Sequence, residues 1–193
     1  MSKQITIPGP DGKRAEWING VLTLVDEQKV DNRPVTERIK TFEDARNELN
    51  RRAEAGDEDA AQLLADYESN ADNIKIKETV AYMQLCIIAA ALNEGWKPQF
   101  TTDEYRYFPW FCFYTQKEID EMDEEEKSRV VRRSFYGAYA SGGVAFVFAY
   151  GDSSNSYAGY GSRLAFKTRE LAEYAGKQFL DIWTDYVFKP KGE

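Results

Sequence analysis

The densest group of side chains that could do chemistry is a run of carboxylates between positions 120 and 126. Carboxylate oxygens hold Ca²⁺ or Mg²⁺ when their spacing places several of them around one ion. This run lacks both the alternating acidic spacing and the central glycine of a calcium loop. We therefore interpret it as a solvated helix face, and we expect neither a metal site nor a cofactor.

The sequence lacks histidine, which removes Ser-His-Asp and Cys-His catalysis and histidine-based zinc sites within one chain. Ser162 follows Gly161, but no imidazole is present to activate it. Lys167 is five residues further along a predicted strand, so its side chain faces the other side. Phosphate-binding glycine loops are also missing. The sequence contains no recognisable catalytic motif, although its 33 acidic residues leave a carboxylate-dependent hydrolase open as a third hypothesis.

Charge is unevenly distributed along the chain, whose formal net charge is −8. Residues 127–177 hold eight lysines and arginines against three acidic residues, so this region is basic on an acidic protein. It has two interpretations. The cations either hold a phosphate, carboxylate or nucleic acid near a helix N-terminus, or pair with the acidic helices of the same chain. The candidate anion-binding residues are Arg132, Arg133, Arg163, Lys167 and Arg169.

The segment from Phe135 to Ser162 has the most informative composition, because 21 of its 28 residues are Gly, Ala, Ser or Tyr. Tyrosines on a background of small residues are typical of an adaptable recognition surface. The same composition also suits a flat, tightly packed sheet against helices, and both interpretations stay open. The candidate binding residues are Tyr136, Tyr139, Tyr150, Tyr157, Tyr160 and Arg163.

A second aromatic stretch runs from Tyr105 to Tyr114, where seven of ten residues are aromatic. Such a cluster stacks nucleic-acid bases when a positive groove adjoins it. The flanks are mainly acidic here, which favours a strand pair of the core instead. Pro109 lacks a backbone N–H, so it predicts an edge strand or two short strands.

Hydrophobic spacing and turn residues predict an α+β fold, with a small antiparallel sheet packed by helices. We expect an extended N-terminal arm over residues 1–40, with a hairpin turn at Asn19-Gly20, and a single domain over 41–193. A helical hairpin begins at Thr41, whose side chain and that of Asp44 form a capping box. The other expected elements are a helix capped by Asp57, a buried helix over 78–93, a capping box at Thr115 and Glu118, strands over 144–150 and 164–166, and a last helix from Thr168 to about Phe188.

The compartment is predicted to be a reducing cytoplasm or a particle assembled there. Residues 1–7 lack the apolar segment of a signal peptide, and the longest apolar stretch is too short to span a bilayer. We therefore expect no membrane partner. The two cysteines, Cys86 and Cys112, are interpreted as reduced thiols that pack as small apolar side chains.

Two stretches carry a resemblance to a known family: GSRLAFKTRELAEYAGKQF at residues 161–179 and IIAAALNEGWKPQFTTDEYRYFPWF at residues 87–111. They resemble a family of small proteins encoded by phages and prophages of gut Bacteroidales. The resemblance covers roughly residues 74–188 and implies a phage context. The family has no established activity, cofactor or catalytic residue, so none is carried over.

Our leading hypothesis from the sequence is a non-enzymatic, phage-encoded protein that acts by protein–protein interaction, as a virion structural or assembly component. Its partner would be another protein or a second copy of the chain. The alternative is a protein that binds nucleic acid or a nucleotide through the basic region 127–177, with binding that weakens steeply as salt rises.

Overall fold

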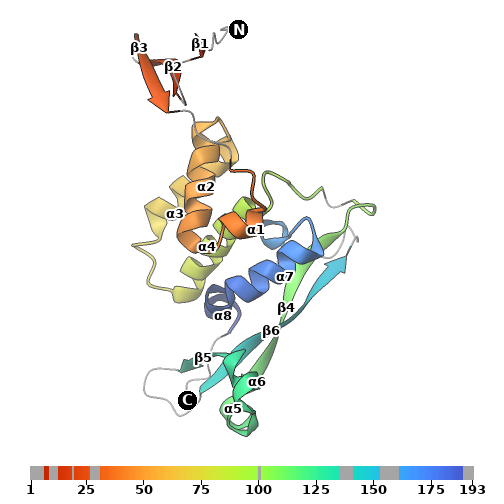
Figure 1. Cartoon of the computed structure of the whole chain (residues 1–193). Helices are drawn as coiled ribbons and strands as arrows, with labels where there is room; N and C mark the ends of the chain where they lie inside the picture. The colour runs from red at the N-terminus through yellow and green to blue at the C-terminus, as the bar shows by residue number, and fades with distance from the viewer. Residues whose placement is uncertain are drawn as a thin grey trace. The chain divides into compact units, whose positions relative to one another are not determined.

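The computed structural model describes residues 7–8, 13–18, 20–26, 31–99, 101–134, 141–152 and 161–188. It divides the chain into two compact units, residues 1–34 and 35–193 (Figure 1). The described strands of the smaller unit form an antiparallel sheet in the order β1-β2-β3: β1 (Ile7–Pro8), β2 (Lys13–Ile18) and β3 (Val21–Asp26). Ile18 pairs with Val21, and Gly20 has a φ of 81°, so the expected hairpin turn is confirmed.

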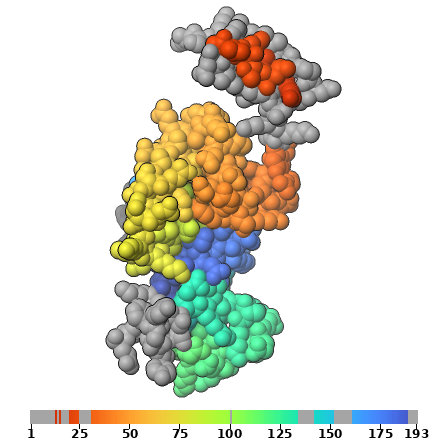
Figure 2. Space-filling model, turned by 90° about the vertical axis from the view of Figure 1, so that its left-hand side faces the viewer, coloured from red at the N-terminus to blue at the C-terminus, as the bar shows by residue number. Residues whose placement is uncertain are grey.

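The larger unit begins at Val35, earlier than the domain start expected at position 41. The reason is the short helix α1 (Val35–Arg38), which is followed by Ile39, a buried residue of the core of this unit. The helices α2 (Phe42–Glu54) and α3 (Glu58–Asn70) form the predicted helical hairpin, and Figure 2 shows them side by side in orange and yellow. Phe42 packs edge-on against Tyr67 and joins the two helices.

Both helices begin with the capping residues that were predicted. Thr41 and Asp44 form the capping box of α2, and Asp57 caps α3 by accepting from the backbone N–H of Ala60 at 3.1 Å. Asp57 also accepts from Arg52, whose guanidinium donates to the Ala90 carbonyl oxygen at 2.8 Å. This set of contacts ties the turn between α2 and α3 to the buried helix α4 (Lys77–Leu92).

Stability is expected to fall in acid partly through Asp57. The hydrogen bond from Arg52, and then that from the Ala60 N–H, lower the pKa of Asp57 below its usual 3.8. A lowered pKa stabilises the folded state above the usual value, and this contribution is lost as the pH falls through the folded value. We therefore expect Asp57→Asn to reduce the drop in urea midpoint between about pH 7 and about pH 3.

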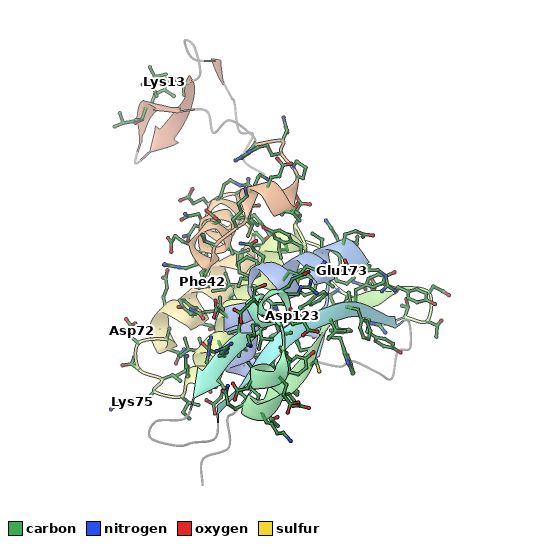
Figure 3. All side chains as sticks on the ribbon, turned by 60° about the horizontal axis from the view of Figure 1, so that its bottom comes forward. Lys13, Phe42, Asp72, Lys75, Asp123 and Glu173 are labelled. Atoms are coloured by element: carbon green, nitrogen blue, oxygen red, sulfur yellow. The ribbon has the colours of Figure 1, made fainter. Side chains whose placement is uncertain are left out.

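The control for that titration is Asp72→Asn, because Asp72 is an exposed carboxylate in the turn after α3 (labelled in Figure 3). It should leave the pH dependence as in the wild type. Equal pH dependence in the wild type and Asp57→Asn would contradict the role given to the cap.

The sheet of the larger unit is antiparallel, in the strand order β4-β6-β5, which confirms an α+β fold. Its strands are β4 (Arg106–Thr115), β5 (Val131–Ser134) and β6 (Ser141–Asp152). Pro109 lies on the edge strand β4, as its missing N–H predicted. The short helices α5 (Gln116–Glu121) and α6 (Glu124–Ser128) connect β4 to β5, and both begin with a capping box.

Two of our predictions for the C-terminal region are wrong. Residues 164–166 were expected to form a strand, but Ser162–Leu164 is a 3-10 helix, η1, and only Phe166 forms a bridge, with Tyr107. The last helix was expected to be continuous, yet it consists of α7 (Arg169–Gln178) and α8 (Leu180–Val187). The break is at Phe179, whose ψ of 29° leaves the helical range while its side chain is buried.

The helices α7 and α8 cover one face of the sheet (Figure 1). A Cβ on Gly176 of α7 would come within 2.4 Å of the Phe146 ring and 2.8 Å of Pro109. A glycine inside a helix costs about 1 kcal/mol relative to alanine, but here it lets α7 approach the strands. Glu173 is on the same helix and is labelled in Figure 3. Its carboxylate forms an ion pair with Lys177.

Candidate functional site

The face of the sheet opposite to α7 and α8 carries exposed aromatic side chains. Trp110 pairs with Phe148 across β4 and β6, and the two rings are stacked with centroids 6.1 Å apart. Tyr150 lies two residues from Phe148, on the same face, with its ring centroid 6.1 Å from that of Trp110. About half of each side chain is exposed, from 44% for Phe148 to 48% for Tyr150. We call Trp110, Val147, Phe148 and Tyr150 the aromatic patch.

A β-bulge creates this patch. Trp110 is opposite Phe148 and Phe111 is opposite Phe146, so Val147 is an extra residue in β6 and is 51% exposed. In a regular strand residues 146 and 148 would share one face. The extra residue turns Phe146 toward α7 while Phe148 stays on the outer face. No local sequence pattern indicates a bulge, because its position depends on the pairing with β4.

The predicted tyrosine segment therefore has two parts within its described residues. At the start of β6 the small residues are tightly packed: a Cβ on Gly143 would meet Val130 at 2.4 Å and Ile119 at 3.2 Å. At the end of β6, Tyr150 belongs to the exposed aromatic patch. The tightly packed sheet is thus seen at the start of β6, and at its end the structure shows an exposed tyrosine. Tyr136, Tyr139, Tyr157 and Tyr160 lie outside the described residues.

Two of the candidate anion-binding residues have carboxylate partners. Arg133 of β5 contacts Asp185 at 2.5 Å and Asp181 at 3.1 Å, both on α8. Lys167 contacts Glu94, just beyond the end of α4, at 3.1 Å.

The other three candidates differ from one another. The guanidinium of Arg169 donates to the Ala149 carbonyl oxygen and lies 5.5 Å from the centre of the Tyr107 ring. Arg132 and Arg163 are exposed, and neither forms an ion pair among the described residues. Two of the five candidates thus lie on β5, and the other three lie between η1 and the start of α7. Each has different contacts, and these contacts do not join the five residues into one site.

A groove of about 290 Å³ lies between α3 and α4, with η1 contributing to its lining. Sequence analysis did not identify it, because three segments separated by up to a hundred residues contribute side chains. The lining residues are Asp59, Gln62, Leu63, Asp66, Cys86, Ala90, Asn93, Trp96, Lys97, Pro98, Ser162 and Arg163.

Asn93 fixes the geometry of this groove. Its side-chain amide donates to the Ala165 carbonyl oxygen at 2.8 Å, and its side-chain oxygen accepts from the Lys167 N–H at 3.0 Å. Asn93 is only 5% exposed, so both hydrogen bonds are shielded from water. The connection from η1 to α7, which carries Arg163, is thereby held against the end of α4.

Cys86 lines the groove with a protonated thiol, because burial raises its pKa to about 11. At about pH 8 only on the order of one thiol in a thousand is then the reactive thiolate. We expect iodoacetamide to alkylate the half-buried Cys112 of the native protein well before Cys86. Peptide mass spectrometry after a timed pulse measures this, with urea-unfolded protein as the control in which both thiols react alike. Equal native rates would contradict the burial of Cys86.

Within the described ranges, the acidic and cysteine side chains form no group of three or more that is arranged to hold a metal ion. The same ranges contain no helix that combines the length and the apolar character needed to cross a membrane. Comparison of the chain with protein-family models, curated proteins and solved structures finds no match.

Proposed function

We propose that this chain acts by protein–protein contact, and that its aromatic patch binds the same patch of a second copy. The observation that carries the proposal is the exposure of Trp110, Phe148 and Tyr150 side by side on a pleated sheet. Tryptophan and tyrosine are the residues that most often dominate the energy of an interface. Contiguous apolar surface of this kind marks contact sites on soluble proteins.

A second copy suits the patch better than a charged partner does. The residues of the patch carry no formal charge, so an acidic or basic surface would find no complementary charge there. Two such faces related by a two-fold axis would stack as sheets about 10 Å apart, with the same set of residues contributed by each copy. Interfaces between identical subunits are also more apolar than the average protein surface.

The phage context that the sequence of residues 74–188 led us to expect supports a wider form of this proposal. We propose that the self-associating chain is a virion structural or assembly component, made in the cytoplasm of the host. It needs no catalytic group for that role. Nucleic-acid binding through Arg132 and Arg163 stays the alternative, and a gel-shift titration over a range of salt concentrations separates it from self-association.

Analytical ultracentrifugation of the wild type and two variants tests the proposal. Trp110→Ala removes the central ring of the patch and should weaken dimerisation at least about thirtyfold, since hot-spot truncations cost about 2 kcal/mol or more. Ile76→Ala is the control, because Ile76 is 57% exposed, just before α4, and is not a residue of the aromatic patch. A wild type that is monomeric up to about 100 µM, or equal dimerisation in all three proteins, would overturn the proposal.

A further inference from the structure

Four charged side chains line the groove between α3 and α4, and two of them pair with each other. Lys97 forms an ion pair with Asp59. The Asp66 carboxylate accepts a hydrogen bond only from the neutral amide of Gln62, at 2.7 Å, among the described residues. Burial raises the pKa of the Tyr82 hydroxyl, the positive charge of Arg163 opposes that rise, and Arg163 forms no ion pair with a carboxylate of the described residues. One carboxylate and one guanidinium therefore line the groove without a counter-charge.

Both groups belong to the lining of the groove. Arg163 is close enough to Cys86 and Tyr82 on α4 to act on both side chains electrostatically. Asp66 precedes Tyr67, whose hydroxyl is 3.5 Å from the Gln84 amide on the same stretch of α4. The two opposite charges thus line the same groove, and they form no ion pair with each other.

The rest of the groove offers apolar surface. Leu63 is one turn before Asp66 on α3, and Ala90 is one turn after Cys86 on α4. Trp96 and Pro98, which follow α4, are half-buried and complete this side. The volume of about 290 Å³ is at the small end of the range for small-molecule sites.

We propose that this groove binds a free amino acid with an apolar or aromatic side chain. The α-carboxylate would accept two parallel hydrogen bonds from the Arg163 guanidinium, and the α-ammonium would donate to Asp66. The side chain of the ligand would pack on Leu63 and Trp96. A zwitterion matches the balanced charge of the groove, whereas a phosphate would face both Asp59 and Asp66 at close range.

Isothermal titration calorimetry with L-phenylalanine tests the proposal on the full chain. N-acetyl-L-phenylalanine lacks the ammonium group and 2-phenylethylamine lacks the carboxylate, so each should bind about tenfold more weakly than the amino acid. Arg163→Gln should weaken L-phenylalanine to a similar extent and leave 2-phenylethylamine unchanged. Asp66→Asn should weaken L-phenylalanine and leave N-acetyl-L-phenylalanine unchanged.

Arg129→Gln is the matched control, because Arg129 pairs with Glu125 on α6 and does not line the groove. It should bind L-phenylalanine as the wild type does. No detectable heat with L-phenylalanine up to about 10 mM, or equal binding by the Arg163→Gln and Arg129→Gln variants, would overturn the proposal. The result is independent of self-association, because no residue of the aromatic patch contributes to the groove.

Discussion

Replacing Trp183 with alanine is expected to lower the free energy of unfolding by about 3–5 kcal/mol, a large part of the stability of a domain of this size. Trp183 is completely buried on α8. Its ring lies 5.3 Å from that of Phe111 on β4 and 6.3 Å from that of Tyr186. The substitution would therefore open a cavity where α8 meets the sheet. Urea denaturation followed by circular dichroism measures the loss.

Trp110→Ala is the matched control, since it also removes an indole ring. Trp183 packs against one face of the sheet from α8, whereas Trp110 lies on the other face. Trp110 is 47% exposed, so we expect this change to cost less than about 1 kcal/mol. A similar loss in both variants would show that the exposed face is also part of the core. A small loss for Trp110→Ala together with lost self-association would assign this residue to binding.

Replacing Asn93 with alanine is expected to cost about 2–4 kcal/mol, because two buried backbone groups would lose their partners at once. Those groups are the carbonyl of Ala165 and the N–H of Lys167, 72 and 74 residues further along the chain. Since Asn93 also holds the segment that carries Arg163, the same change should weaken any ligand of the groove. Thermal denaturation and calorimetry on one preparation measure the two effects.

Asn73→Ala provides the comparison for Asn93. Asn73 is exposed in the turn between α3 and α4, and its amide donates only to the Ser69 carbonyl oxygen, at 3.2 Å. We expect a loss below about 0.5 kcal/mol, as for most surface substitutions. A loss of that size for Asn93→Ala as well would mean that water replaces its hydrogen bonds, and that the connection to α7 is not held there.

Helix starts were the most predictable part of this fold, because a cap is decided by residues close together in sequence. Thr41 with Asp44 and Thr115 with Glu118 form the predicted capping boxes, and Asp57 and Asp123 cap the helices that follow them. The buried helix α4 was also predictable, since its apolar residues cover more than one face.

Elements decided by distant contacts were not predictable in the same way. Residues 164–166 have strand-like composition, yet they form only the end of η1 and a single bridge, because Asn93 binds the backbone at Ala165 and Lys167. The helical pattern of residues 169–188 continues through Phe179, but burial of that ring ends α7. The groove was missed for the same reason, since Asp66 and Arg163 come together only in the folded chain.

The bulge at Val147 determines how β6 would respond to a change in its length. Deletion of Val147 would make Phe146 and Phe148 adjacent, and regular alternation would still place their side chains on opposite faces of the sheet. Deletion of a residue elsewhere in β6, with the bulge kept, would move the side chains on one side of the deletion to the wrong face. Natural variants of this chain should therefore tolerate a change of length at position 147 better than at the flanking positions of β6.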